Sequence, residues 1–571
     1  MTAHVTTQEE LENPADGDWL HIHHTYNGHR FAEQDEINRD TVGDLRVAFT
    51  LGIAGVHGGA SRYANTQLEG TPLVEGGIMY FPSGWGEIYA VDVTAGDHAN
   101  VLWRMDPDID EAWAGDVACC GVENRGVALY RDQIISSALD GRVIATNKAT
   151  GEVTWEITVA DPGFGETITV GPQVVDNIGI VGSAGAEYGI RGFIVGVNLD
   201  DGTEAWRTFT VAGPDEPGGE TWMADGTYQN GGGSIWVTGT YDPALDLAYW
   251  GTGNPGPDWD AEYRPGDNLY TDSVLAITPG NGEIVWYHQY TPNDPFDYDE
   301  IGEHVLIDVE INGEMRSVAT HAARNGHVYT FDRATGEFLY ATQYVDTVSW
   351  TAGIDPKTGM PVEWESGADD GIVDYVAGAA ARRDGTIGTQ CPLITGGKNW
   401  EPSAYSPETG LLYIPGGEGC NQMKTEITLG PPDPRGFFIG ADFAFFGAEA
   451  VEPANPDWVV EEYGSLAAFD VATGELVQKI YLSAPQRSGV MVTSGDLLFF
   501  GEPDGWVYAV DAHDLENTLW RFNVGTSIKA PPMSYEIDGK QYIAILVGSS
   551  IPGGPEYAGF APQAMLYVFT L

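Results

Sequence analysis

Short runs of alternating apolar and polar residues recur along the whole chain, and each run ends at a turn. In the commonest form, an apolar segment is followed by Asp or Asn, then by Thr-Gly or an equivalent turn, then by a second segment that ends in Trp. Alternation with a period of two is typical of strands that bury one face, and glycine-containing turns join such strands into hairpins. The pattern therefore predicts an all-β chain.

Seven copies of this hairpin unit can be recognised. They cover residues 88–103, 143–155, 193–206, 274–286, 328–340, 466–478 and 507–520. The strand at 44–49 can belong to an eighth, degenerate copy. Each hairpin leaves an apolar face uncovered, and a radial arrangement of four-stranded blades would bury these faces and protect the sheet edges. We therefore predict an eight-bladed β-propeller, in which the last strand, 564–570, pairs with an N-terminal strand and closes the ring.

The chain shows no long Pro- or Ser-rich linker, so we predict a single domain over residues 1–571. Its hydrophobic residues make up 42 %, enough for a large core, and no run of about 18 apolar residues suggests a membrane-spanning helix. Long insertions interrupt the repeats at roughly 207–240, 341–400 and 421–460. In a propeller such loops gather at the ends of the blades, where they can build a site over the central channel.

The charge of the chain narrows the choice of function. Its 571 residues include 84 acidic and 26 basic side chains, which give a formal net charge of −58. A nucleic-acid partner bound through phosphate contacts is excluded, because no basic surface exists to make them. Such a charge repels itself in dilute salt, whereas molar salt shortens the Debye length to ~3 Å. We therefore predict a protein adapted to very high salt; the alternative is an ordinary acidic secreted protein.

Four cysteines, Cys119, Cys120, Cys391 and Cys420, permit two disulfides and so an oxidising compartment. Residues 1–12 are polar and acidic and do not resemble a signal peptide. We expect an extracytoplasmic protein, secreted or at the cell surface, whose signal is not in this chain; a cytoplasmic protein is the alternative. Adjacent Cα atoms lie ~3.8 Å apart, below the usual disulfide range of ~4.4–6.8 Å. The residues alone therefore leave open a strained Cys119–Cys120 bond, free thiols or bonds to other cysteines.

Six further motifs stand in order between the repeats. They are Cys-Cys-Gly-Val-Glu-Asn-Arg-Gly at 119–126, Gly-Ser-Ala-Gly-Ala-Glu-Tyr-Gly-Ile-Arg-Gly at 182–192, Gly-Thr-Gly-Asn-Pro at 251–255, Thr-Pro-Asn-Asp-Pro-Phe-Asp-Tyr-Asp at 291–299, Arg-Asn-Gly at 324–326 and Gly-Gly-Lys-Asn-Trp at 396–400. Together with the Trp-ending repeats, this ordered set resembles the quinoprotein alcohol dehydrogenases, which use pyrroloquinoline quinone (PQQ). The resemblance extends from residue 18 to the C-terminus.

The resemblance implies a set of cofactor-binding residues. They are Glu69, Cys119, Cys120, Arg125, Thr169, Gly185, Ala186, Trp236, Arg324 and Asn399. In this family a disulfide between the adjacent cysteines covers one face of PQQ and the Trp covers the other, while Cys391 and Cys420 would pair as an ordinary disulfide. Arg125 suits a PQQ carboxylate because a guanidinium binds carboxylate with two hydrogen bonds. The chain departs from the family at Ala184, which stands where the family usually has a Ser hydroxyl for the cofactor.

The resemblance also implies a metal site formed by Glu187, Asn254, Asp297 and Asp299. Carboxylate and amide oxygens are hard ligands that suit Ca²⁺. Asp299 lies two residues after Asp297, as in the lanthanide-using members of the family, whereas calcium-using members commonly have a small uncharged residue there. We therefore expect one lanthanide(III) or Ca²⁺ ion. The general excess of Asp in this chain is the alternative explanation of Asp299.

The implied reaction is oxidation of a small primary alcohol to an aldehyde by hydride transfer to PQQ. Asp297 would be the base and Arg324 would stabilise charge on the quinone oxygens. Because the chain has no C-x-x-C-H haem motif, electrons would pass to an external carrier, a cytochrome c or a blue-copper protein. The chain could also form a homodimer. Two alternatives stay open: a quinoprotein acting on a sugar or polymer alcohol, and a non-catalytic propeller scaffold in envelope protein assembly.

Overall fold

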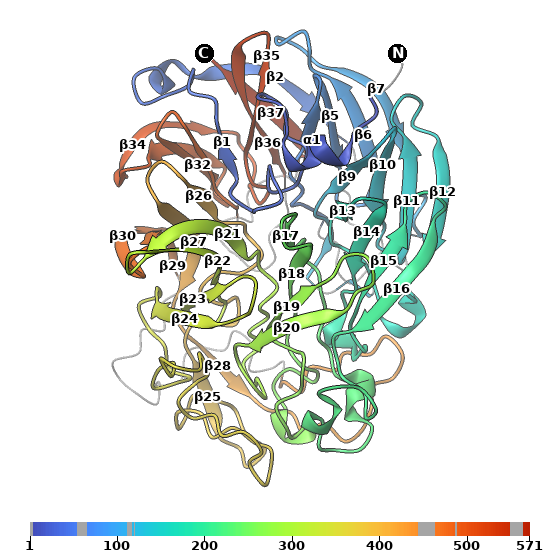
Figure 1. Ribbon diagram of the computed structural model, residues 1–571, viewed down its shortest axis with the longest axis vertical. Coiled ribbons are helices and arrows are strands. Elements are labelled where there is room, and N and C mark those ends of the chain that lie inside the picture. The colour runs from blue at the N-terminus through green and yellow to red at the C-terminus, as the bar shows by residue number, and fades with distance from the viewer. Residues whose placement is uncertain are drawn as a thin grey trace.

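Eight sheets radiate around a central axis in the computed structural model (Figure 1), which describes residues 4–53, 66–110, 117–118, 120–442, 463–485, 488–548 and 563–571. The first four blades follow one another in the chain. Their strands are β4 (Leu73–Glu75), β5 (Ile78–Pro82), β6 (Ile88–Asp92) and β7 (Asn100–Met105); β9 (Val127–Tyr130), β10 (Gln133–Ser137), β11 (Arg142–Asn147) and β12 (Val153–Thr158); β13 (Gln173–Val175), β14 (Ile178–Gly182), β15 (Phe193–Asn198) and β16 (Thr203–Phe209); β17 (Thr240–Asp242), β18 (Leu247–Gly251), β19 (Ser273–Ile277) and β20 (Ile284–Gln289).

The remaining four blades complete the ring. Their strands are β21 (Val305–Ile311), β22 (Glu314–Ala322), β23 (His327–Asp332) and β24 (Phe338–Gln343); β26 (Ala404–Ser406), β27 (Leu411–Glu418), β29 (Tyr463–Asp470) and β30 (Glu475–Leu482); β31 (Met491–Thr493), β32 (Leu497–Gly501), β33 (Trp506–Asp511) and β34 (Asp514–Asn523), joined by β1 (Phe31–Ala32); β35 (Met533–Ile537), β36 (Lys540–Val547), β37 (Met565–Thr570) and β2 (Arg46–Gly52). Helix is scarce, with α1 (Gln8–Glu12) the one α-helix of the described residues. Two small sheets, β3 (Thr66–Leu68) with β8 (Val122–Asn124) and β25 (Ile387–Gln390) with β28 (Asn421–Lys424), lie outside the blades.

The predicted eight-bladed propeller is confirmed. Each of the seven sequence repeats forms the third and fourth strands of one blade, for example β6 with β7 and β33 with β34. The eighth blade is closed by strands from both ends of the chain. β2 pairs antiparallel with β37, so that Arg46 lies opposite Thr570 and Gly52 opposite Met565. This closure hides edges that an open sheet would expose.

The Trp that ends a repeat packs on the turn of the next blade. The indole Nε1 of Trp103 donates to the carbonyl of Lys148 at 2.8 Å. The same ring covers Gly151, where a Cβ would lie 2.8 Å from ring atoms and where φ is +73°. Glycine is therefore required at this turn both for space and for the left-handed backbone. Trp155 covers Gly202 in the same way. The Trp that ends one repeat and the turn Gly of the following repeat are therefore both needed for the same contact.

The N-terminal segment 19–31 crosses the ring and contacts blade after blade. Its hydrogen bonds reach Val74, Val174, Tyr241, Leu306, Tyr405, Val490 and Pro532, which lie in or beside seven blades. Arg30 is fully buried and donates to the carbonyls of Val490 and Pro532 at 2.9 and 2.6 Å. The segment thereby links distant blades through backbone groups.

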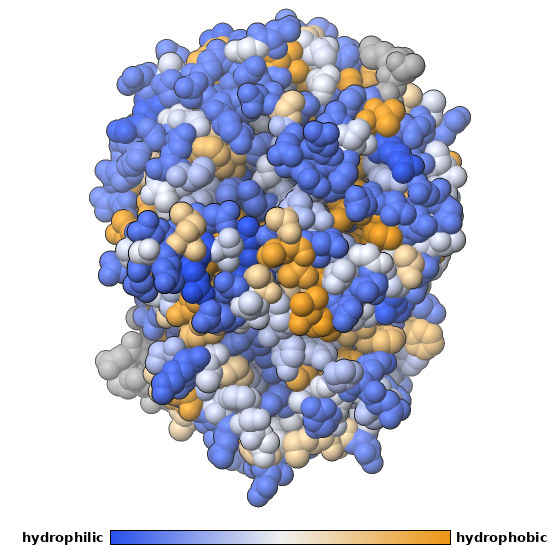
Figure 2. All heavy atoms as spheres, in the orientation of Figure 1, coloured by the Kyte–Doolittle hydropathy of each residue, from blue (hydrophilic) through white to orange (hydrophobic). Residues whose placement is uncertain are grey.

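The face shown in Figure 2 is dominated by hydrophilic residues with scattered apolar ones, as the net charge of −58 leads one to expect. Inside, one hydrophobic cluster joins the first four blades to the last two, and a second joins the two blades between them. Among the residues that the structure describes, none of the helices has the length and apolar character needed to cross a bilayer.

Candidate cofactor and metal site

A cleft lies where connections from the second to the fourth blade meet. It contains about 450 Å³ of free space, its open mouth included. Its walls are Ala118, Cys120, Glu123, Arg125, Thr167, Thr169, Ala184, Gly185, Glu187, Ser234 and Trp236. Six of the residues expected from the sequence, Cys120, Arg125, Thr169, Gly185, Glu187 and Trp236, are thus brought together. Cys120 and Trp236 are 116 positions apart in the sequence, and the propeller fold brings their segments together in one wall.

Arg125 is the best-held cation of the cleft. Its guanidinium donates to Thr169 Oγ1 at 2.7 Å and lies 2.9 Å from Glu69 Oε2. Its Cζ stands 4.6 Å from the centroid of the Trp236 ring, within cation–π range. A second carboxylate, Glu123, contacts Arg125 at 3.4 Å. The predicted Glu69, Arg125, Thr169 and Trp236 therefore form one connected group, and a planar, anionic ligand would find both a ring and a guanidinium there.

Two residues that contact this charged group were not anticipated, Glu123 and Lys529. Glu123 lies in β8, two positions before Arg125, which follows the end of that strand, and the two side chains lie on the same side of the chain. Its Oε2 is buried and has no hydrogen-bond partner. Lys529 Nζ lies 3.1 Å from Glu69 Oε1 and also donates to Gln67. The period of two around Arg125 could have revealed Glu123, whereas Lys529 comes from the last blade and carried no local signal.

The other expected cofactor residues are placed differently. Ala186 is buried and begins a short 3₁₀ turn, Ala186–Tyr188, after Gly185 at φ +119°. Asn399 lies in a neighbouring pocket with Thr395, where its amide donates to the Thr395 carbonyl at 3.0 Å. The structure therefore does not bring Asn399 into the wall of the main cleft.

The cysteine predictions divide into two outcomes. Cys391 and Cys420 form a disulfide with Cα atoms 4.4 Å apart, as predicted. Cys120 is itself disulfide-bonded, but Cys119 lies outside the described residues. The bond between the adjacent cysteines stays a prediction.

Arg324 lies between the two predicted acids of the 291–299 motif. Its guanidinium donates to Asp299 Oδ2 at 2.6 Å and stands 3.5 Å from Asp297 Oδ2. Burial would lower the pKa of Arg324, but the two carboxylates outweigh it and raise that pKa. Asn254 joins the group through its backbone N–H, which donates to Asp299 Oδ1 at 2.8 Å. The structure thus places Asn254, Asp297, Asp299 and Arg324 in one cluster.

The conformation of Asp297 is fixed by a neighbouring acid. Asp294 accepts hydrogen bonds from the backbone N–H groups of Phe296 and Tyr298, both at 2.8 Å. These bonds clamp the residues on either side of Asp297, which adopts φ +63°. Asp tolerates this left-handed region better than most residues. The tight turn explains how the Asp297 carboxylate is directed toward Arg324.

Asp258 is a further acid of this cluster that sequence reasoning missed. Its side chain is 1 % exposed, and its Oδ1 has no hydrogen-bond partner. The Asn254 side chain bonds to it, and Glu187 and Asp299 both act on its charge. Among 84 acidic residues, one more Asp gave no signal in the sequence.

Burial raises the pKa values of these carboxyls, because few cations are near them. The pKa of Glu187 rises to about 7, chiefly through burial and secondarily through repulsion by Asp299, while Arg324 opposes the rise. Burial likewise raises the pKa values of Asp258 and Asp297 well above the usual range. The cluster holds more acid than Arg324 can neutralise, which fits a site for a cation with oxygen ligands.

The acidic side chains of this cluster do not converge on one point in the structure. Across the described ranges, no three His, Cys, Asp or Glu side chains are gathered closely enough to hold an ion by themselves. Arg324 occupies Asp299 Oδ2, and Asn254 contributes an amide rather than a carboxylate. In this arrangement one oxygen of Asp299 is therefore taken up by Arg324 and not directed at a shared ion position.

Comparison with known proteins shows which family the chain belongs to. The profile described as "PQQ: Glucose/ethanol/alcohol dehydrogenase, beta-propeller domain" matches residues 19–349 and 461–543. The quinoprotein alcohol dehydrogenase PedH of Pseudomonas putida is 32 % identical, over 100 % of this chain and 94 % of that protein. The dehydrogenase subunit of a quinone alcohol dehydrogenase from Gluconacetobacter polyoxogenes is 34 % identical, over 93 % of this chain and 71 % of the relative. A solved europium-containing methanol dehydrogenase superposes with a TM-score of 0.86 at 30 % identity, covering 99 % of this chain and 100 % of that one.

Proposed function

This chain belongs to the family of PQQ-dependent alcohol dehydrogenases with a β-propeller fold, and from that premise we propose how its own residues hold PQQ and a metal ion. The chain is an oxidoreductase that oxidises alcohols with PQQ. The single observation that carries the assignment of the site is the connected group of Glu69, Arg125, Thr169 and Trp236 in the cleft. Arg125 and Thr169 would bind a cofactor carboxylate, and Trp236 would lie against the ring.

The metal would be held by Glu187, Asn254, Asp297 and Asp299, with Asp258 as a further oxygen donor. The unpartnered, buried Oδ1 of Asp258 supports this set, because a buried carboxylate without a partner costs free energy that a cation would recover. Four carboxylates suit a trivalent ion better than a divalent one, so a lanthanide(III) is favoured over Ca²⁺. The likeness to a europium-containing methanol dehydrogenase agrees with that preference.

The chemistry divides between the bound groups and the chain. When bound, PQQ supplies the acceptor for the hydride of the alcohol carbon, and the metal supplies Lewis-acid polarisation of the reactive quinone carbonyl. Asp297 accepts the proton of the alcohol hydroxyl, which leaves an aldehyde. Burial alone raises the pKa of Asp297 well above its usual value, and a cation beside it would keep the carboxylate ionised for that role. Arg324 donates hydrogen bonds that stabilise developing negative charge.

The substrate would be a small primary alcohol, and the electrons would leave to an external cytochrome c or blue-copper protein. An extracytoplasmic location is supported by the Cys391–Cys420 disulfide, since disulfides persist in oxidising compartments. Adaptation to very high salt is supported by the net charge of −58. A homodimer is part of the same proposal.

The test is reconstitution of the purified protein with PQQ and either Ca²⁺ or La³⁺, in dilute and in molar salt. We expect dye-linked oxidation of small primary alcohols with La³⁺ in molar salt, and loss of at least a hundredfold in Asp299→Ala. Binding of La³⁺ should weaken about tenfold in Asp258→Asn, equivalent to about 1.4 kcal/mol.

Asp260→Asn is the matched control, because Asp260 lies two residues from Asp258 but binds Arg383 at 2.6 Å. Activity with Ca²⁺ alone would remove the lanthanide assignment and keep the enzyme. Absence of PQQ binding with both metals would overturn the proposed site.

A further inference from the structure

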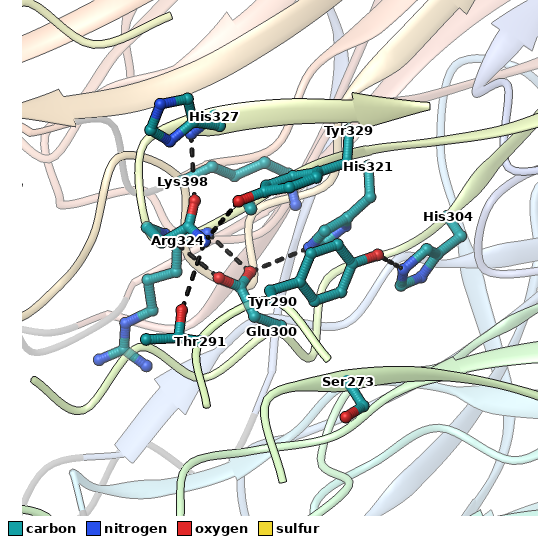
Figure 3. Close-up of polar contacts among 12 residues, drawn as sticks. Ser273, Tyr290, Thr291, Glu300, His304, His321, Arg324, His327, Tyr329 and Lys398 are labelled. Carbon is teal, nitrogen blue, oxygen red and sulfur yellow. Dashed lines mark hydrogen bonds and ion pairs between the residues drawn. The ribbon is translucent and has the colours of Figure 1, made fainter. Parts of the chain in front are cut away.

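Glu300 follows Asp299 in the sequence and contacts the main chain of Arg324. It is fully buried, and its Oε2 accepts the backbone N–H of Arg324 at 2.8 Å (Figure 3). Its Oε1 accepts the backbone N–H of Asn325 at 3.3 Å. Asp299 and Glu300 are consecutive, yet the first holds the guanidinium of Arg324 and the second holds its main chain. Two consecutive residues therefore bind both the main chain and the guanidinium of Arg324.

His321 fixes the carboxylate of Glu300. Its Nδ1 lies 3.1 Å from the carbonyl of Glu303, and its Nε2 lies 3.1 Å from Glu300 Oε2. The imidazole therefore joins the main chain of Glu303 to the carboxylate of Glu300. The His304 ring stacks on His321 with centroids 4.3 Å apart and prevents the imidazole from turning.

The far side of Arg324 is fixed as well. Its Nε donates to the carbonyl of Ile394 at 3.0 Å, and the N–H of Ile394 donates to Asn421 Oδ1 at 2.6 Å. Asn421 follows Cys420, which is bonded to Cys391, so the disulfide joins the two segments that present this carbonyl. The Nη2 of Arg324 also donates to the Ile394 carbonyl, at 2.5 Å, so the main chain, Nε and Nη2 are all held, while Nη1 donates to Asp299.

We propose that Glu300 and His321 are a positioning pair that sets the main chain of Arg324 and, through it, the distance of its guanidinium from Asp297 and Asp299. This inference rests on the proposed function of the site. Neither residue contacts the cleft, so the pair acts on PQQ and on the reaction only through Arg324. Positions of reacting groups need to be held within about 0.5 Å by such supporting contacts.

Glu300→Gln is the sharpest substitution because it keeps the shape. The new side-chain amide can adopt two orientations. If its oxygen takes the place of Glu300 Oε2, its NH₂ group faces the N–H of Asn325; if the amide is reversed, the NH₂ group faces the N–H of Arg324. In both orientations one hydrogen-bond donor faces another donor. Glu303→Gln is the matched control: Glu303 is 2 % exposed, binds Lys398 at 3.0 Å and accepts the N–H of Ser403, but it does not bond to Arg324 through its carboxylate.

The experiment is a double-mutant cycle on PQQ affinity in the metal-loaded protein. We expect Glu300→Gln to weaken PQQ binding about tenfold and to lower kcat at least tenfold, with KM for the alcohol changed less than twofold. In an Arg324→Ala background, the same Glu300→Gln change should alter PQQ affinity less than twofold. A residue with a merely structural role would lose the same factor in both backgrounds, and that result, or an equal loss in Glu303→Gln, would overturn the proposal.

Amide hydrogen exchange of the protein without PQQ supplies an independent arm. In Glu300→Gln, the backbone amide that faces the new side-chain nitrogen, that of Arg324 or that of Asn325, should exchange at least tenfold faster, while Glu303→Gln leaves both unchanged. Unchanged exchange at these two amides in Glu300→Gln would overturn the proposal. If the unmodified chain binds no PQQ with either metal, the proposed function fails, and the exchange arm still decides whether Glu300 fixes Arg324.

Discussion

At the scale of single residues, buried acids are the main feature of this protein. Glu123, Asp258 and Glu300 are all nearly or fully buried, and each lies beside a residue expected from the sequence. Glu123 touches Arg125, Asp258 bonds to Asn254 and Glu300 bonds to Arg324. The expected residues therefore mark where the site is, and these acids determine how its charges are balanced.

Glu123 leads to a pH dependence of cofactor affinity. Burial raises its pKa to about 8, repulsion by Glu69 adds to the rise, and Arg125 and Lys529 oppose it. At pH 7 the carboxyl is protonated and can donate a hydrogen bond to a cofactor carboxylate. Above pH 8 it ionises and repels that carboxylate, so PQQ affinity should fall by up to about tenfold per pH unit. Measurement of the PQQ dissociation constant between pH 7.5 and 9.5 checks this.

Two variants test whether Glu123 causes this pH dependence of PQQ affinity. Glu123→Gln keeps a donor that does not titrate, so its PQQ affinity should stay constant over the same range. Glu502→Gln is the control, because burial raises the pKa of Glu502 to about 7 but Glu502 is not among the residues of the cleft wall. The range begins at pH 7.5 because Glu187, in the same cleft, has a pKa raised by burial to about 7. An equal fall in Glu123→Gln would contradict the prediction.

At the scale of elements, the hairpin repeats were predictable because the information is local. The period of two, the turn glycine and the terminal Trp all lie within about 15 residues of one another. The cleft was predictable only through the ordered motifs that identify the family. Lys529 was not, because its partner Glu69 lies 460 positions away and becomes a neighbour only after folding. Asp258 lies four residues after Asn254, but acids are too common in this chain for it to stand out.

The contact between Trp155 and Gly202 makes a prediction about how neighbouring blades stabilise each other. A Cβ on Gly202 would lie 2.7 Å from the Trp155 ring, and φ at Gly202 is +70°. We expect Gly202→Ala to lower the free energy of unfolding by about 2–4 kcal/mol, because the left-handed backbone strain of about 1 kcal/mol is joined by the clash. In a Trp155→Ala background only the strain should be left. Denaturant unfolding of the four proteins in the cycle measures this.

Gly410 offers a control at nearly the same backbone angle. Its φ is +71°, but no atom lies within 4 Å of the position that a Cβ would take. Gly410→Ala should therefore cost about 1 kcal/mol, the strain alone. If Gly410→Ala and Gly202→Ala cost the same, the indole does not couple the blades.

At the scale of the whole molecule, two devices hold the ring together. One is the pairing of β2 with β37, which joins the ends of the chain within one blade. The other is the segment 19–31, which forms hydrogen bonds with backbone carbonyls and amides of seven blades. The first followed from the count of repeats. The second did not, because a short polar segment with several histidines has no periodic pattern that would place it across the ring.

The contribution of the segment 19–31 to holding the ring together can be tested at Arg30. Burial lowers the pKa of Arg30 to about 9, so it is still cationic at pH 7, and its guanidinium serves carbonyls of Ile22, Val490 and Pro532. Arg30→Met keeps the apolar stem but leaves these buried carbonyls without a donor, at about 1–3 kcal/mol for each unpaired group. We expect the free energy of unfolding to fall by about 3–5 kcal/mol in total, since such losses are not additive.

The consequence of losing Arg30 should also appear in distant blades. Val490 precedes β31 and Pro532 precedes β35, so hydrogen exchange in Arg30→Met should quicken at both strands together, although 40 residues separate them. Arg39→Met is the control, because Arg39 is 48 % exposed and binds one carboxylate, Asp511, at 2.9 Å. Asp511 is buried but also accepts the N–H of His513 at 2.9 Å, so loss of the half-exposed Arg39 should cost only about 0–1 kcal/mol. Equal losses in the two variants would mean that the segment covers the ring without holding its blades.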